Sequence, residues 1–102
     1  MALGTVILAA QTAAGPSTLQ ITVVAGTPQT VAVFASTAAP LLDGETVTVQ
    51  RQVQAAWYQA YDQHGVPIVL TPLRNEATLL YPGVYQAVKS LTVDLVGVVT
   101  DS

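Results

Sequence analysis

The sequence predicts an all-β protein, either a β-sandwich or a jelly-roll-like barrel of about eight to nine short, mostly antiparallel strands. Apolar and polar residues alternate with a period of two, as where Leu19, Ile21 and Val23 alternate with Gln20 and Thr22. Turn-forming sequences recur at intervals of roughly ten residues, and no window of that length carries the apolar stripe of a helix. Many short strands separated by regular turns are typical of these two architectures.

We expect one domain over residues 1–102, because the chain has the length of a single domain and no linker, charge block or repeat divides it. Apolar residues make up 51% of the chain and aromatic residues only 6%, so the core must be built mainly from aliphatic side chains. In chain order, the turns are expected at 14–17, 25–28, 42–44, 63–65 and 81–83. The strands are expected at about 3–12, 18–25, 29–36, 45–53, 56–62, 67–71, 77–81, 84–89 and 93–100.

Two of these elements need a separate argument. The segment 53–61 contains three alanines that would tolerate a helix, but its aromatic residues favour a strand and 62–65 is typical of a hairpin loop. The sequence Pro82-Gly83 predicts a tight type II turn, with proline at the first central position and glycine supplying a positive φ. Tyr81 and Tyr85 flank this predicted hairpin closely enough to brace it.

Charged residues make up only 9% of the chain, against about 25% in a typical soluble domain. The first charged side chain is Asp43. A chain so poor in charge favours a surface covered by partners or by copies of itself, and we expect a homo-oligomer; a monomer with a neutral polar surface is the alternative. Three scattered basic residues and a net charge of −3 argue against a nucleic-acid partner.

A membrane partner is also not expected, because no unbroken apolar run approaches the ~18 residues of a spanning helix. The first ten residues lack the basic segment of a signal peptide, and Gly4-Thr5 interrupt their apolar stretch, so we expect a strand there. The absence of cysteine excludes disulfides, thiolate metal sites and a cysteine nucleophile.

No motif indicates an enzyme, a cofactor or a metal site. His64 with Asp62 could act as a general base or a metal ligand, but a polar residue at the tip of a hairpin is the simpler interpretation. A Ser-His-Asp triad stays open, since its members need not be neighbours in sequence, but nothing marks a nucleophile. Asp43 and Glu45 flank Gly44 and could be a carboxylate pair or part of a Ca²⁺ loop; further ligands are missing, which favours a solvated turn.

The aromatic cluster of Trp57, Tyr58 and Tyr61 is open to two interpretations. Strand alternation would place Trp57 and Tyr61 on one face and Tyr58 on the other. Exposed, such a face could stack a sugar ring or anchor a protein partner. The interpretation that we favour makes Trp57 the central core residue and puts the tyrosines near the rim.

The second half of the chain has the order of a known group of proteins. It runs through 44–50, an aromatic strand, 65–71, the segment 81–89 and a final 96–98. This pattern resembles small structural proteins of tailed bacteriophages, in particular capsid decoration (cement) proteins and head-fibre-like β domains. The likeness departs at Gln86, where the pattern often has a basic residue.

The resemblance covers roughly residues 19–100 and implies a virion protein on the capsid surface whose partner is the major capsid protein. A tail, neck or fibre-base component is one alternative, and a carbohydrate-binding or adhesin module using Trp57, Tyr58 and Tyr61 is another. We expect residues 1–14 to be a partner-contacting strand or arm that adds to a neighbour's sheet. The candidate contact residues are Leu3, Val6, Leu8, Tyr58, Tyr61 and Arg74.

Overall fold

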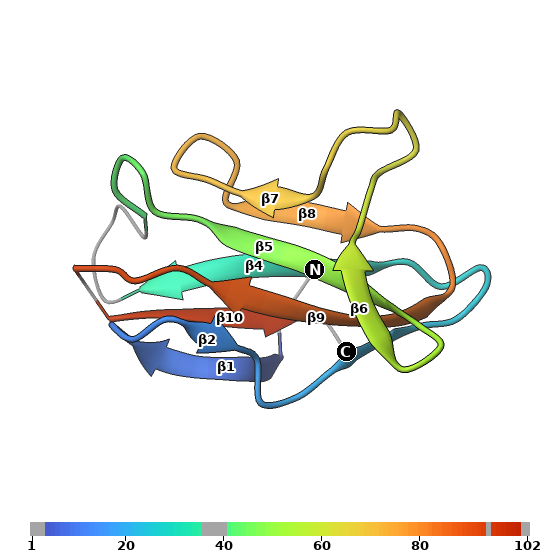
Figure 1. Cartoon of the computed structure of the whole chain (residues 1–102), viewed down its shortest axis with the longest axis horizontal. Helices are drawn as coiled ribbons and strands as arrows, with labels where there is room; N and C mark the ends of the chain where they lie inside the picture. Colours follow the sequence, from blue (N-terminus) through green and yellow to red (C-terminus); the bar gives the residue numbers. More distant parts are fainter. Residues whose placement is uncertain (1–3, 36–40, 94, 101–102) are drawn as a thin grey trace.

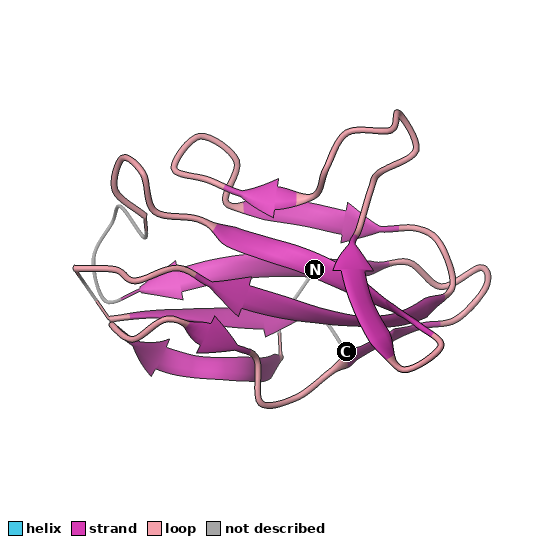
Figure 2. Cartoon of the chain, in the orientation of Figure 1, coloured by secondary structure: helices cyan, strands magenta, loops and turns pink. Residues whose placement is uncertain are grey.

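The computed structural model describes residues 4–35, 41–93 and 95–100, and it confirms the all-β prediction. Ten strands form two sheets, every pairing between the named strands is antiparallel, and the described residues contain no helix (Figures 1 and 2). In the first sheet the order is β1 (Thr5–Gln11), β10 (Val96–Thr100), β4 (Gln29–Ala35) and β8 (Glu76–Leu79).

The second sheet is built around β9 (Gly83–Lys89) and β5 (Val47–Val53), which pair with each other. The outer side of β9 pairs with β2 (Gly15–Pro16) and then β3 (Ile21–Val23); the outer side of β5 pairs with β6 (Ala56–Gln59) and then β7 (Val69–Leu70). Each central strand is thus flanked on its outer side by two short strands rather than by one long strand, and one of the two sheets is curled into a half-barrel.

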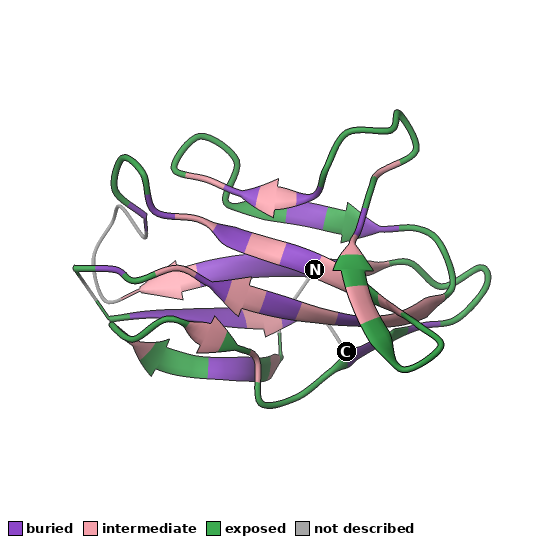
Figure 3. Cartoon of the chain, viewed as in Figure 1, coloured by how far each residue is buried: buried purple, intermediate pink, exposed green. Residues whose placement is uncertain are grey.

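The two sheets enclose an aliphatic core, as the composition predicted. Burial alternates with exposure along β5, β8 and β9, whereas β4 and β10, in the middle of the first sheet, are buried along most of their length. The loops at both ends are mostly exposed (Figure 3). Tyr85 is the one aromatic side chain of the described residues that is fully buried in this core. The rest of the core is made by Ile7, Leu8, Ile21, Val23, Val31, Val33, Leu41, Val47, Val49, Ala60, Ile68, Leu70, Ala77, Leu79, Ala87, Val96 and Val98.

The predicted hairpin at Pro82-Gly83 is wrong. β8 belongs to the first sheet and β9 to the second, so this segment carries the chain from one sheet to the other. Gly83 has a φ of 153°, far from the value of about 80° in a type II turn. A local sequence that permits a sharp change of direction does not specify whether the next strand pairs with the previous one.

The predicted bracing of this segment is confirmed. The Tyr85 hydroxyl donates a hydrogen bond of 2.7 Å to the carbonyl of Tyr81. A buried tyrosine that bonds back to the backbone where the chain changes sheets is the tyrosine corner found in many β-sandwiches.

Candidate functional site

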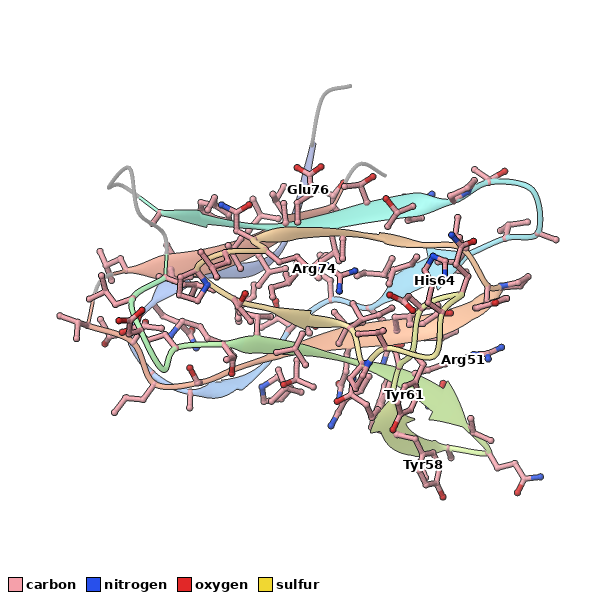
Figure 4. All side chains as sticks on the ribbon, turned by 90° about the horizontal axis from the view of Figure 1, so that it is seen from above. Arg51, Tyr58, Tyr61, His64, Arg74 and Glu76 are labelled. Carbon is pink, nitrogen blue, oxygen red and sulfur yellow. The ribbon has the colours of Figure 1, made fainter. Side chains whose placement is uncertain are left out.

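A hairpin made by β5 and β6 extends beyond the body of the sandwich at one end (Figure 4). Its two-residue turn consists of Gln54 and Ala55, which have φ values of 50° and 67°. Positive φ at both positions is the geometry of a type I′ turn, whose twist matches that of the strands and which usually contains Asn-Gly. The hairpin is therefore held in a conformation that its turn residues do not favour.

Beside this hairpin lies a hollow of about 290 Å³, which we call the tyrosine groove. It is lined by three exposed aromatic residues, Tyr58, Tyr61 and Tyr81, which are 58%, 53% and 47% exposed. The other residues that line it are Arg51, the buried Tyr85, Val53, Gln59, Ala60 and Asp62. The groove thus joins side chains from β5, β6, the loop after β6 and the crossover into β9.

Arg51 is held in this groove by the crossover. Its Nη2 donates a hydrogen bond of 2.7 Å to the carbonyl of Pro82. A Cβ on Gly83 would lie only 2.8 Å from the Arg51 Nε, so the guanidinium occupies space that only glycine leaves open. Within the described part of the chain, Arg51 has no ion-pair partner, because the one salt bridge there joins Arg74 to Asp62.

The structure corrects the predicted arrangement of the aromatic cluster. Tyr58 and Tyr61 line the same groove instead of facing opposite ways, because β6 ends at Gln59 and strand alternation stops there. Trp57 does not line the groove, and the prediction that it is the central core residue is wrong: it is half-buried on an edge strand. Tyr85 takes the core position.

A second hollow, of about 340 Å³, lies on the other side of Asp62 and is lined in part by His64, Arg74 and Glu76. The Asp62 Oδ1 accepts hydrogen bonds from the backbone amides of His64 (2.8 Å) and Val66 (3.0 Å). These bonds, Val66 first, lower the pKa of Asp62 below its usual value. The carboxylate therefore closes the loop, and Arg74 lies 3.9 Å from its Oδ2.

This geometry is that of a hairpin loop and not of a catalytic pair. Asp62 bonds to backbone amides rather than to the imidazole of the exposed His64. Within residues 4–35, 41–93 and 95–100, no group of three or more histidine, cysteine, aspartate or glutamate side chains could hold a metal ion. The same ranges contain no helix long and apolar enough to cross a membrane.

At the opposite end of the sandwich, the predicted solvated turn at Asp43-Gly44-Glu45 is only partly right. Gly44 has the expected positive φ, of 84°. Glu45, however, is buried, and its two carboxylate oxygens accept hydrogen bonds of 2.9 Å from the amides of Leu42 and Val93. These bonds lower the pKa of Glu45 from its ordinary value. The carboxylate ties two loops together.

Lys89 is the second buried charge at this end and is only 1% exposed. Its Nζ donates hydrogen bonds to the carbonyls of Thr12, Ala13 and Ser90, at 3.1, 3.1 and 3.0 Å. Burial lowers the pKa of Lys89, and the charge of Glu45 partly opposes that shift. Sequence reasoning missed this network, since both residues belong to types that are usually exposed.

The loops that these charges hold together expose an apolar surface, which we call the apolar end: Leu42, Leu91, Val93 and Leu95. Leu91 and Val93 are 72% and 75% exposed. The sequence placed Val93 and Leu95 in a strand, but β10 begins only at Val96. Figure 1 shows the loop between β9 and β10, the loop before β5 and the β1–β2 loop gathered at this end, far from the β5–β6 hairpin.

The N-terminal segment was expected to contact a partner, and the structure limits that role. Residues 5–11 form β1 within the chain's own first sheet, and Leu8 is a core residue that offers no surface. At a bulge, the carbonyl of Ile7 accepts hydrogen bonds from the amides of Thr18 and Leu19, which cover part of the strand's outer edge. Val6 is exposed, and Leu3 lies outside the described residues.

Comparison with known proteins identifies no relative: no family model, curated protein or solved structure matches the chain.

Proposed function

We propose that this domain is a structural protein of a tailed-bacteriophage particle that decorates or cements the capsid by binding the major capsid protein. The observation that carries the proposal is the apolar end, where large aliphatic side chains are exposed while Glu45 and Lys89 are buried beneath them. Exposed apolar surface of this kind typically marks a protein–protein contact. The choice of a capsid as the partner depends on the sequence resemblance.

The way these loops are fastened supports a docking role. Glu45 and Lys89 bond to backbone groups of neighbouring loops, so Leu91 and Val93 are presented on a cross-linked and not a free segment. A contact surface that is ordered before binding loses less conformational entropy on docking. This suits a protein that must occupy many equivalent sites on a lattice.

The test is co-sedimentation with capsids that are assembled from the major capsid protein of the phage encoding the chain and that lack this domain. We expect saturable binding, with a copy number per capsid that matches the number of equivalent lattice positions. A tail or neck component would instead be present in the few copies of one ring. Val93→Asn should weaken binding, whereas Val24→Asn, the same change at a comparably exposed residue in the turn at the opposite end, should not. No binding to capsids, or equal binding by the two variants, would refute the proposal.

A further inference from the structure

We propose that the tyrosine groove binds an acidic saccharide, with the sugar carboxylate on Arg51 and the sugar ring against the tyrosines. This inference is independent of capsid binding, because it concerns the other end of the sandwich. Figure 4 shows Arg51, Tyr58 and Tyr61 together at and beside the projecting hairpin, away from the loops of the apolar end. Both ends could therefore be occupied at once.

Arg51 supplies the charge for the carboxylate. Only its Nη2 is engaged, by the Pro82 carbonyl, and its positive charge has no carboxylate partner among the described residues. Asp62 also lines the groove, but its carboxylate is held by two backbone amides and lies beside Arg74. The remaining N–H groups of a guanidinium form a planar fork that matches a carboxylate. The bond to Pro82 and the open space at Gly83 fix this fork before any ligand arrives.

The three exposed tyrosines supply the surface for a sugar ring. The hydroxyls of Tyr58, Tyr61 and Tyr81 make no hydrogen bond with any described residue, so each can donate to and accept from a ligand. An aromatic ring offers an apolar body and a tyrosine adds a polar tip. A sugar ring has the matching character, since its C–H faces are apolar and its edge carries hydroxyls.

Other ligand classes fit less well. Nucleic acid requires clustered cations, and Arg51 is the only basic residue that lines the groove. A hollow of about 290 Å³ lies at the lower limit for small-molecule sites, which suits one or two sugar rings. An amphipathic helix would need a long apolar groove, whereas the aliphatic side chains lining this hollow are only Val53 and Ala60.

The turn of the hairpin gives additional support. Gln54 and Ala55 both have left-handed backbone conformations, which residues other than glycine adopt only at a cost. Unfavourable backbone conformations persist where the surrounding structure imposes them, and they cluster at ligand sites. Here they hold the strand that positions Tyr58 beside Arg51.

The test uses four carboxylated saccharides with different backbones: trigalacturonate, a hyaluronan tetrasaccharide, sialyllactose and a guluronate trimer. Binding is followed by chemical-shift changes in the chain of 102 residues, including the Arg51 side-chain Nε–H signal. We expect at least one of the four to bind. The neutral counterpart of the best ligand, such as methyl-esterified trigalacturonate, should have an affinity at least about tenfold lower. No binding by any of the four, or equal binding by the neutral form, would overturn the proposal.

Two pairs of variants locate the site. Arg51→Gln should weaken binding about tenfold or more, whereas Arg74→Gln, which removes the same charge beside the neighbouring hollow, should change it less than about twofold. Tyr58→Ala should also weaken binding. The Tyr58 hydroxyl makes no hydrogen bond with the described residues, and the substitution leaves the backbone pairing of β6 with β5 in place, so the fold should persist, as thermal unfolding would check. Equal effects of the two arginine changes, or a hexaglutamate peptide that binds as well as the saccharides, would refute the assignment.

Discussion

The hydrogen bond of the tyrosine corner offers a sharp test of how the two sheets are connected. Tyr85→Phe removes one buried hydroxyl and leaves the ring, so it creates almost no cavity. The lost bond, 2.7 Å to the Tyr81 carbonyl, is worth about 0.5–1.5 kcal/mol net. Tyr81 is partly exposed, so water can reach its carbonyl in the variant. We therefore expect a loss of about 1 kcal/mol, which corresponds to a decrease in Tm of roughly 4–8 °C.

Urea unfolding followed by circular dichroism measures this loss, and Tyr81→Phe is the matched control. The Tyr81 hydroxyl makes no hydrogen bond with the described residues, so its removal should change stability by less than about 0.5 kcal/mol. Wild-type stability in Tyr85→Phe, or an equal loss in the control, would refute the reasoning.

The same hydroxyl predicts a dependence on alkaline pH. Burial raises the pKa of Tyr85 above its ordinary value of 10.0. The pKa of Tyr85 is higher in the folded state than in the unfolded state. The contribution of the neutral hydroxyl to stability is therefore fully present below the unfolded pKa, and it is lost as the pH rises through the folded pKa. The stability difference between wild type and Tyr85→Phe should therefore shrink above about pH 10, and a difference that stays constant would contradict this.

Three further changes test the backbone and a buried charge. Ala55→Gly should raise the free energy of unfolding by about 1 kcal/mol, because the native φ of 67° is costly for alanine. Ala56→Gly in the adjoining strand should lower the free energy of unfolding by roughly 0.5–1 kcal/mol. Urea unfolding compares the two variants, and a loss of stability in Ala55→Gly would contradict the turn assignment. Gly97→Ala should lower the free energy of unfolding by about 1–3 kcal/mol, because the new Cβ would lie 2.5 Å from a ring carbon of Phe34. Gly4→Ala is the control: Gly4 has open space around it, so the change should alter stability by less than about 0.5 kcal/mol. Equal effects of the two changes in unfolding experiments would contradict the packing around Gly97. Glu45→Gln should reduce the loss of Tm on acidification between roughly pH 6 and pH 2. The pKa of Glu45 is lowered in the folded state, so the carboxylate's contribution to stability is present above the unfolded pKa and is lost as the pH falls through the folded pKa. A plot of Tm against pH that runs parallel to that of wild type would contradict this.

The sequence predicted those elements whose cause is local. Alternation along Val47–Val53 and the uncharged β-prone stretch at residues 5–11 both became strands close to the expected bounds. The tyrosine brace at Tyr81 and Tyr85 was also expected, because the two residues are near neighbours in the chain. Each of these features depends on periodicity or turn chemistry, which a short window of sequence contains.

Features that depend on which strands become neighbours could not be predicted in this way. The pairing of β9 with β5 rather than with β8 is decided by the whole sandwich, so the Pro82-Gly83 segment was misassigned. The burial of Lys89 depends on carbonyls of Thr12 and Ala13, more than 70 positions away in the chain. The tyrosine groove could be predicted only in part. The sequence indicated Tyr58 and Tyr61 as contact residues, but that they line one groove together with Arg51 depends on the three-dimensional structure.

The charge poverty of the chain has a different meaning once the charges are located. Of the three basic residues, Lys89 is buried at the apolar end, Arg74 lies beside Asp62, and Arg51 lies unpaired in the tyrosine groove. The first adds no exposed charge to a surface that exposes Leu91 and Val93, where Asp43 is an exposed charged residue, and this supports the proposed contact with another protein there. The last concentrates charge where tyrosines can hold a polar ring. Because the chain has so few charged side chains, the position of each one has a large effect on the surface around it. The two proposed ligands differ accordingly: an apolar protein surface at the apolar end and an acidic saccharide in the tyrosine groove.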